Sequence, residues 1–509
     1  MYRESTGAGL TEEFGYTLQG WLSEQRGDRF GMRLRYYDPQ HSDTKPSYTG
    51  NITEWDWQHR GPDIADSQPN TYCFAYDALS RLTDTRQYIA GVPDDRFVEK
   101  GLSYDRNGNI LTLKRTSGGV IADSLVYSYS GNQLTALSGT ISPFDYTYDA
   151  NGNMTYDGAN NLDLTYNLLN LTEKVSGSDG IEANYSYLSD GTKLSATDAS
   201  GNGLFYLGSL VYRKQGGKLS LESGSFGGGR FVATASGLSP VYHLTDHLGS
   251  VRVVFDADGE ILERNDYYAF GLRWDNSASP ISDNRYRYNG KEEQAFVNVP
   301  YTDYGARMYD PKYRLGWGSV DPLAEKYYPV GPYVFCLNNS IRLIDPGGRK
   351  VYFADGVSQE FKDKFTATIR YMNSKGTSGN MAKLEASENV YYINEAKSVY
   401  KTNFNAKTKT INWDPNHLVL TDEGILMSPA TALAHEADHA QRYDKVVREN
   451  DDSAKKEYND SIKPNSDNQY STKEERRVIQ GAEQSAARKH GDINAKQTTR
   501  KNHKGTQAN

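Results

Sequence analysis

Aromatic and polar residues alternate along the first half of the chain, from about Tyr16 to Gly271. The clearest repeats are SYDRNGNILTL from Ser103 and YTYDANGNMTYD from Tyr146, and weaker ones begin at Phe74, Tyr127 and Tyr185. A period of two is typical of β-strands, and Asn-Gly is the favoured pair in two-residue hairpin turns. The pattern therefore predicts one β-hairpin in each repeat.

Hairpins of this kind gain stability by pairing with one another. A single hairpin is marginally stable in water, whereas a series of similar hairpins can form one continuous sheet. An irregular β-propeller or a β-sandwich would also explain the spacing of the repeats. We expect an all-β first region, with a continuous sheet unless the repeats form separate blades.

The pattern changes between Asn284 and Gly348, where the sequence is less regular and richer in proline. Three Asp-Pro pairs occur there, at Asp310, Asp321 and Asp345, and two glycines follow the last pair. Proline fixes the backbone angle φ and glycine allows it to be positive. Each pair therefore predicts a tight turn.

After Lys350 the composition changes to Lys, Glu, Asp and Ala with few glycines, which predicts a separate α+β domain. An amphipathic stretch begins at Phe361, and two strands are predicted, NVYYINEA from Asn389 and TKTINWDP from Thr408. A polar loop joins the two strands. We therefore expect them to pair in antiparallel fashion beside an active site.

A helix with the spacing of a metal site follows, in ILMSPATALAHEADHAQ. Ser428 suits the N-cap and Pro429 the first helical position. His435 and His439 lie four residues apart on one face, where both imidazoles can bind one zinc ion. Glu436 would then act as general base for the metal-bound water. This H-E-x-x-H spacing predicts a metallopeptidase, and the alternative is a charged helix with these residues on its surface.

A third protein ligand is expected in YSTKEERRVIQGAEQSAARKHG, which lies further along the chain. Ser471 can cap a helix that has Glu474 at its third position, a capping box. Glu475 shares a helix face with Val478 and Ile479, and a carboxylate that faces a core needs a cation. We therefore predict Glu475 as the third ligand.

Other acids and histidines remain as alternatives. Glu474 and Glu483 are the reserve ligands, and their roles without metal would be capping and a solvated helix face. His417 and His490 are weaker candidates, because single histidines more often lie on a surface or in a core. Asp438 could orient one of the metal-binding histidines as a hydrogen-bond acceptor.

The composition limits the classes of partner. The chain has 509 residues, 39 of them tyrosine, and a formal charge of -8. This length predicts two or three domains, and the acidic balance argues against general affinity for nucleic acid. The one basic run, from Lys496 to Lys504, is predicted to be a solvated tail. Cys73 and Cys336 are too few for a disulfide framework, and we expect both to be buried thiols.

The sequence contains no apolar run long enough to span a bilayer, and no signal-peptide core follows Met1. Export would therefore depend on an upstream region or on dedicated secretion machinery.

Five motifs occur in a fixed order before residue 349. They are DHLGSVR at Asp246–Arg252, YNGKE at Tyr288–Glu292, DYGARMYDP at Asp303–Pro311, DPLAEKYY at Asp321–Tyr328 and DPGG at Asp345–Gly348. Together they resemble the core of the Rhs and YD-repeat family, whose polymorphic toxins place a shared core just before a variable C-terminal toxin. The resemblance covers roughly residues 10–348. It implies an all-β spiral shell, or cocoon, over residues 1–271, a core over 272–348, and an enclosed cargo over 349–509 with a basic tail from about 491.

The same resemblance implies that the chain cuts itself. In the family, two carboxylates near such motifs act like an aspartic-protease pair and cut the chain just after the last motif. The matching residues are Asp321 and Asp345, with scission close to Gly348 and Arg349. Two nearby carboxylates can share a proton, so one can serve as base for water and the other as acid.

HEADHA followed by EERRVIQGAE resembles the zincin toxins of the M91-like effector peptidase group. This resemblance implies a zinc endopeptidase with His435, His439 and Glu475 as ligands and Glu436 as base. A toxin of this class would be secreted or delivered by secretion machinery, would cut a protein of the target cell, and would be neutralised by a cognate immunity protein. The alternatives are a YD-repeat surface or adhesion protein with a non-catalytic C-terminus, and an enzyme that cuts another amide, such as a peptidoglycan link.

Overall fold

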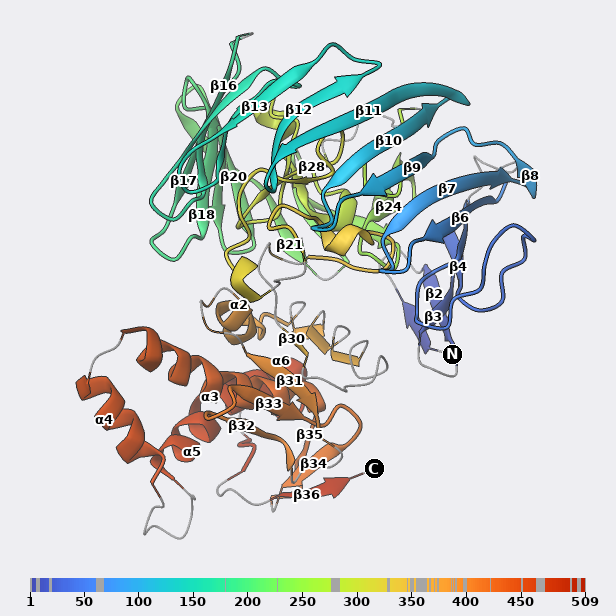
Figure 1. Cartoon of the computed structure of the whole chain (residues 1–509). Coiled ribbons are helices and arrows are strands. Elements are labelled where there is room, and N and C mark those ends of the chain that lie inside the picture. Colours follow the sequence, from blue (N-terminus) through green and yellow to red (C-terminus); the bar gives the residue numbers. More distant parts are fainter. Residues whose placement is uncertain are drawn as a thin grey trace. The chain divides into compact units, whose positions relative to one another are not determined.

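The computed structural model divides the chain into two compact units, Met1–Thr17 with Leu22–Arg349 and Leu18–Trp21 with Lys350–Asn509 (Figure 1). It describes residues 2–5, 10–17, 21–60, 68–178, 180–226, 228–275, 284–326, 330–345, 347, 352–353, 364–365, 368–369, 371–372, 375–385, 387, 389, 391–396, 401–421, 423–449, 452–463, 472–494, 497–500 and 505–508.

An antiparallel 8-stranded sheet begins the first unit, with its strands in chain order. The strands are β1 (Tyr2–Ser5), β2 (Thr11–Tyr16), β3 (Leu22–Gly27), β4 (Phe30–Arg35), β5 (Glu54–His59), β6 (Asn70–Tyr76), β7 (Leu82–Ile89) and β8 (Val92–Pro93).

Strands β9 to β25 form a second sheet, which closes on itself. They are β9 (Glu99–Tyr104), β10 (Ile110–Ser117), β11 (Val120–Ser130), β12 (Gln133–Gly139), β13 (Phe144–Tyr148), β14 (Met154–Asp157), β15 (Leu162–Tyr166), β16 (Thr172–Gly177), β17 (Glu182–Tyr187), β18 (Lys193–Asp198), β19 (Gly203–Leu207), β20 (Leu210–Gln215), β21 (Lys218–Phe226), β22 (Gly229–Thr234), β23 (Gly237–Thr245), β24 (Val251–Phe255) and β25 (Ile261–Arg264). Strands that are neighbours in sequence are also neighbours in the sheet, from blue to green in Figure 1. The predicted hairpins are therefore confirmed, and they lie in two continuous sheets instead of separate blades.

The turns of these hairpins are longer than predicted. Between β9 and β10 the amide of Asp105 donates to the carbonyl of Asn109, which leaves a three-residue loop in place of a two-residue one. The Asp105 carboxylate accepts from the amides of Asn107 and Asn109 at 2.9 and 2.8 Å. Gly108 has a φ of 84°, which favours glycine over residues with a side chain. The first Asp of the repeat therefore organises the turn, and the expectation from Asn-Gly alone was wrong in turn type.

Tyrosine at the end of a strand links successive hairpins. The hydroxyl of Tyr187, the last residue of β17, donates to the carbonyl of Thr172 at the start of β16 (2.8 Å). Tyr166 does the same to Met154 (2.9 Å), and Tyr104 to Leu82. Tyrosine can bury its ring and still satisfy a backbone carbonyl through its hydroxyl. This dual role explains why the repeats carry tyrosine at this position.

The irregular segment from residue 284 to 345 packs against the repeat sheet of the first unit. Its short elements are η3 (Tyr288–Gly290), β26 (Glu292–Glu293), η4 (Gln294–Val297), β27 (Thr302–Asp303), β28 (Met308–Asp310), β29 (Gly316–Trp317), η5 (Ala324–Lys326) and η6 (Cys336–Asn338). Lys193 of β18 binds the carboxylates of Glu292 (3.0 Å) and Asp303 (2.6 Å) in this segment. Such buried ion pairs fix the segment to the sheet. Cys73 and Cys336 are buried free thiols, as predicted.

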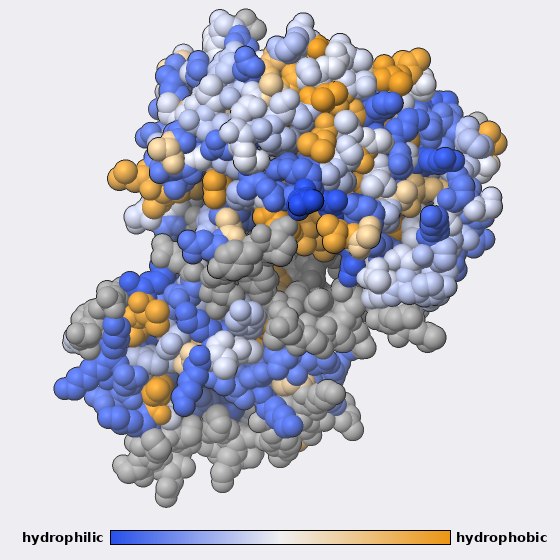
Figure 2. All heavy atoms as spheres, viewed as in Figure 1, coloured by the Kyte–Doolittle hydropathy of each residue, from blue (hydrophilic) through white to orange (hydrophobic). Residues whose placement is uncertain are grey.

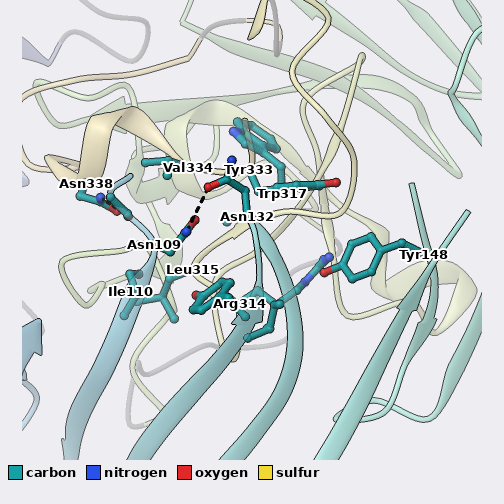
Figure 3. A pocket seen from close by; sticks show the side chains of 14 residues that line it. Asn109, Ile110, Asn132, Tyr148, Arg314, Leu315, Trp317, Tyr333, Val334 and Asn338 are labelled. Carbon is teal, nitrogen blue, oxygen red and sulfur yellow. Dashed lines mark hydrogen bonds between the residues drawn. The ribbon is translucent and has the colours of Figure 1, made fainter. Parts of the chain in front are cut away.

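A cavity of about 40 Å³ lies where repeat turns meet this segment (Figure 3). The Asn109 amide donates to Asn132 there at 3.1 Å, beside Arg314, Trp317 and Tyr333. A volume of this size holds a few water molecules at most.

The second unit contains two small sheets. The first has the order β30 (Tyr352–Phe353), β31 (Tyr392–Glu395), β33 (Thr410–Trp413) and β32 (Asn403–Asn405), and the second has the order β35 (Leu426–Met427), β34 (Leu418–Thr421) and β36 (Gly505–Ala508). β31 and β33 pair in parallel, so the predicted antiparallel pair is wrong. The loop between them contains β32, which forms the antiparallel hairpin with β33. Because β32 reverses the chain once more, β33 runs in the same direction as β31.

The helices of the second unit are α2 (Gly379–Glu385), α3 (Pro429–Glu449), α4 (Asp452–Ser461), α5 (Lys473–Val478) and α6 (Gln484–His490), with a π-helical turn, η8 (Ile479–Glu483), between the last two. Of the predicted amphipathic stretch from Phe361, residues 364–365, 368–369 and 371–372 are helical, and the rest lies outside the described residues. The core of this unit joins α2, α3 and the first sheet through residues that include Leu384, Ile393, Ile411, Trp413 and Leu433.

Figure 2 shows small hydrophobic patches among hydrophilic residues on the described surface of both units. Within the described ranges, no helix combines the length and apolar character needed to cross a lipid bilayer.

Candidate metal centre

Helix α3 carries the H-E-x-x-H motif, and its predicted start is confirmed. The Ser428 hydroxyl accepts from the amide of Thr431 at 3.3 Å, which is the contact of an N-cap, and Pro429 is the first helical residue. Leu433, Ala434 and Ala437 on this helix are buried in the core. Their burial fixes the rotation of the helix, so that His435 and His439 are held toward α5 and η8, against which α3 packs.

The helix that supplies the third predicted ligand begins one residue later than expected. The hydroxyl of Thr472 accepts from the amide of Glu475 at 3.0 Å, so Thr472 is the N-cap and Glu475 is at the third helical position. The capping box with Glu474 is therefore wrong, and Ser471 lies outside the described residues. The shift frees the carboxylate of Glu474 for another contact.

Three side-chain donors converge between these helices. The Nε2 atoms of His435 and His439 are 3.2 Å apart, and the Glu475 carboxylate lies 3.3 Å from the first and 3.2 Å from the second. In a tetrahedral zinc site with bonds of about 2.0–2.1 Å, ligand atoms are separated by about 3.3 Å. The residues present therefore fit a zinc ion held by two imidazoles and one carboxylate. The structure brings together all three residues that the sequence predicted as ligands.

Glu436 lies beside this cluster. Its carboxylate is within 4.8 Å of the donor atoms of His435 and His439, and the side chain is buried, with 8% exposed. Among the described residues, none forms a hydrogen bond or ion pair with that carboxylate. Its oxygens are therefore available to accept a proton from a water molecule at the cluster.

The two reserve ligands contact the other side of the imidazoles. Glu483 lies 2.8 Å from Nδ1 of His435, and Glu474 lies 3.4 Å from Nδ1 of His439. A carboxylate at Nδ1 favours a proton on that nitrogen and leaves the lone pair on Nε2 for a metal. Glu474 and Glu483 thus support the histidines in this geometry and do not join the converging donors. Glu483 is 1% exposed, so the predicted solvated role is wrong.

The π-helical turn explains why Glu483 is buried. In a regular α-helix, Glu483 would lie about 80° around the axis from Glu475. One residue inserted by a π turn moves it back by about 100°, so the two carboxylates end about 20° apart. Both therefore face α3, and no sequence pattern predicted this.

Arginines bind the outer carboxylates. Arg500 donates from Nε and Nη2 to Glu483, at 3.1 and 2.5 Å. Glu474 accepts from Arg477 at 2.7 Å and from Arg442. Arg500 belongs to the basic run that was predicted to be a solvated tail, and this prediction is wrong at Arg500. Its guanidinium is buried because Glu483 is a buried carboxylate that needs a cation.

The carboxylates around His435 and His439 raise the pKa of both imidazoles. Burial acts to lower the pKa of His435, but the carboxylates of Glu475 and Glu483 outweigh it and raise the pKa to about 10. Burial acts in the same sense on His439, and Glu474 and Glu475 raise its pKa. For Glu483 burial acts to raise the pKa, and His435 and Arg500 bring it down to about 2. The cluster therefore favours a cation between its imidazoles and Glu475, whether a proton or a metal ion.

The remaining candidates lie elsewhere. His417 contacts Asp414 through Nδ1 at 2.9 Å, and His490 lies between the hydroxyls of Thr377 and Thr431. Asp438 binds Arg477 at 2.6 Å and accepts from Asn380 instead of orienting a histidine.

In the first unit, Asp321 and Asp345 are also brought together. Both carboxylates contact Nη2 of Arg307, at 3.0 and 2.9 Å, and the Arg307 guanidinium stacks on Trp317. The two acids therefore share a guanidinium in this structure, where the prediction had them share a proton. The predicted scission point at Gly348 and Arg349 lies outside the described residues.

Comparisons with known proteins identify a family and a fold. Residues 46–312 match the family described as Teneurin YD-shell. The chain is similar to the solved structure of the Photorhabdus luminescens Tc holotoxin pore with a mutated TccC3, at 20% identity and a TM-score of 0.54 over 70% of this chain and 19% of that one. It is also similar to the crystal structure of TcdB2–TccC3 without hypervariable C-terminal region, at 16% identity and a TM-score of 0.31 over 68% and 26% of the two chains. A search of curated proteins found no match.

Proposed function

The chain belongs to the Teneurin YD-shell family, and we propose that it is a toxin-related shell protein whose second unit is a zinc-dependent peptidase. The family match covers the repeats of the first unit. Support for a toxin comes from the likeness to a Tc holotoxin pore, of whose length this chain covers 19%. Support for the peptidase comes from the convergence of His435, His439 and Glu475, with Glu436 beside them.

His435 and His439 would hold the metal through Nε2, and Glu475 through its carboxylate. Zinc bound there would polarise a carbonyl and lower the pKa of a bound water molecule toward neutrality. Glu436 would accept the proton of that water and pass it to the leaving amine of the cut peptide bond. Glu474 and Glu483 would keep the two imidazoles in the orientation and tautomer that metal binding requires.

The proposed setting is delivery into another cell. The protein would be secreted or delivered by secretion machinery, would cut a target-cell protein, and would have a cognate immunity protein in the producing cell. The alternative is a YD-repeat surface or adhesion protein with a non-catalytic C-terminus. In such a protein His435, His439 and Glu475 would not need to bind zinc.

Replacement of the general base tests the peptidase. Glu436→Gln in the full chain should keep its zinc but lose toxicity on intracellular expression, because general base catalysis contributes about 10²–10⁴-fold. Glu423→Gln, an exposed acid of the same unit, is the matched control and should remain as toxic as wild type. Full toxicity of Glu436→Gln would rule out the proposed mechanism.

We also propose that Asp321 and Asp345 cut the chain near Gly348. The supporting observations are their meeting at Arg307 and the position of Gly347, whose carbonyl accepts from the amide of Ala306 at 3.3 Å. The wild-type chain should yield two fragments by mass spectrometry, whereas Asp345→Asn should stay whole. Asp258→Asn, at an exposed hairpin turn, should be cut normally. An intact wild-type chain would contradict this proposal.

A further inference from the structure

Arg500 connects the end of the chain to the candidate metal centre. Its Nε and Nη2 atoms bind Glu483 at 3.1 and 2.5 Å, and the Glu483 carboxylate binds Nδ1 of His435 at 2.8 Å. Nη2 of Arg500 also lies 3.7 Å from the Glu475 carboxylate. The same Nη2 lies 3.5 Å from Nδ1 of His435. One guanidinium is therefore close to two proposed ligands, and it also binds the Glu483 carboxylate that contacts His435.

The chain on both sides of Arg500 is anchored in the second unit. Thr499 has no exposed surface. Beyond Arg500, β36 pairs with β34 over four residue pairs, from Leu418 with Ala508 to Thr421 with Gly505. The described neighbours of Arg500 on either side, Thr499 and β36, are therefore both part of the packed second unit.

We infer that Glu483 and Arg500 form a positioning pair that sets the metal affinity of the site by holding His435. This inference rests on the proposed zinc function. The π turn brings Glu483 to the Nδ1 side of His435, and the fork of Arg500 holds the Glu483 carboxylate from two nitrogens. With the imidazole oriented in this way, its Nε2 stays aimed at the point shared with His439 and Glu475.

A role in positioning can be separated from a simple effect of charge. Arg500 carries a positive charge close to the place of a cation, so its charge alone would weaken metal binding. If charge were the main effect, Arg500→Met would therefore raise the zinc affinity, and Arg500→Lys would leave it unchanged. If positioning is the main effect, both variants lose affinity, because neither lysine nor methionine reproduces the two-nitrogen fork.

The test measures zinc affinity of the full chain by competition with a fluorescent chelator. Arg500→Lys, Arg500→Met and Glu483→Gln should each weaken zinc binding about 10–100-fold, the usual range for residues that support a metal ligand. In each variant the absorption bands of bound cobalt, which report coordination geometry, should shift as well. Arg488→Met is the matched control, because Arg488 is an exposed arginine of α6 bound to Gln484, and it should behave as wild type.

Each result decides a different point. Zinc affinity and cobalt bands like those of wild type in Arg500→Lys and Glu483→Gln would overturn the positioning pair while leaving the zinc site intact. Tighter zinc binding by Arg500→Met would overturn it in favour of a charge effect. A wild-type chain that takes up no zinc would overturn the proposed function, and this inference with it.

Discussion

Two of the clusters in which carboxylates converge on basic side chains contain the acids predicted to be functional, and the basic group differs between them. In the first unit, Asp321 and Asp345 meet at one nitrogen of Arg307, at 3.0 and 2.9 Å. In the second unit, Glu475 meets the Nε2 atoms of His435 and His439, at 3.3 and 3.2 Å. A guanidinium stays protonated and fills the place that a metal ion would need, whereas an imidazole can give up its proton and offer a lone pair. Of these two clusters, the one with histidines is suited to bind a metal.

Arginine is present in both clusters, but its position differs. Arg307 lies between the carboxylates, while Arg500 binds Glu483 on the far side of His435. An arginine in the outer position neutralises a supporting acid without occupying the centre of the donors. An arginine therefore fills the centre of the first cluster, whereas in the second cluster an arginine binds a supporting carboxylate and leaves the centre open to a metal ion.

The largest expected effect comes from removing the central carboxylate of the second cluster. Glu475→Gln should weaken zinc binding of the full chain by more than about 100-fold, beyond the range for residues that only support a ligand. Asp345→Asn is the matched change in the first unit and should leave zinc binding unaltered. Chelator competition measures both. Equal effects of the two changes would remove the distinction between the clusters.

Removal of the central arginine should destabilise the first unit. Arg307→Met leaves two carboxylates without their cation and should lower the free energy of unfolding by about 3–5 kcal/mol. Arg106→Met, at an exposed turn, should have little effect. Combining Arg307→Met with Asp321→Asn and Asp345→Asn should restore most of the loss. Urea denaturation followed by tryptophan fluorescence measures all three, and an unchanged Arg307→Met protein would show that the ion pairs are not needed.

A smaller effect is expected from acid on another closed cluster of the first unit. Burial acts to raise the pKa of Glu292, and Lys193 and Arg285 lower it to about 2. Because the folded pKa lies below the unfolded one, this contribution is present above about pH 4.5 and is lost as the pH falls toward 2. Glu292→Gln should therefore show a weaker dependence of unfolding free energy on pH in this range. An identical pH dependence of the unfolding free energy in the variant and the wild type would show that Glu292 does not make this contribution.

Much of the fold followed from local patterns in the sequence. The alternation around Tyr146 and Tyr185 predicted hairpins, and Ser428 with Pro429 predicted the start of α3. These features are determined by residues close together in sequence, so they could be predicted without knowledge of the tertiary structure. The spacing of His435 and His439 belongs to the same class, because one helical turn fixes their separation.

The parts that were missed depend on longer-range packing. The parallel pairing of β31 with β33 required the short strand β32, hidden in a polar loop. The burial of Glu483 required a π turn, and Arg500 was placed by a partner seventeen residues away in sequence. The sequence contained one indication of the role of Glu483, which was a second acidic residue downstream of Glu475 in the same helical segment. For Arg500, the sequence showed only an arginine within the basic run from Lys496 to Lys504, and nothing in that run indicated a buried partner.

The most direct test of the zinc site is the metal content of the full chain. Wild-type protein purified without chelators should contain about one zinc per chain, and the double variant His435→Ala with His439→Ala should contain none. Inductively coupled plasma mass spectrometry measures the zinc content of both proteins. A wild-type chain without zinc, or a double variant that retains it, would contradict the account of this cluster as a metal centre.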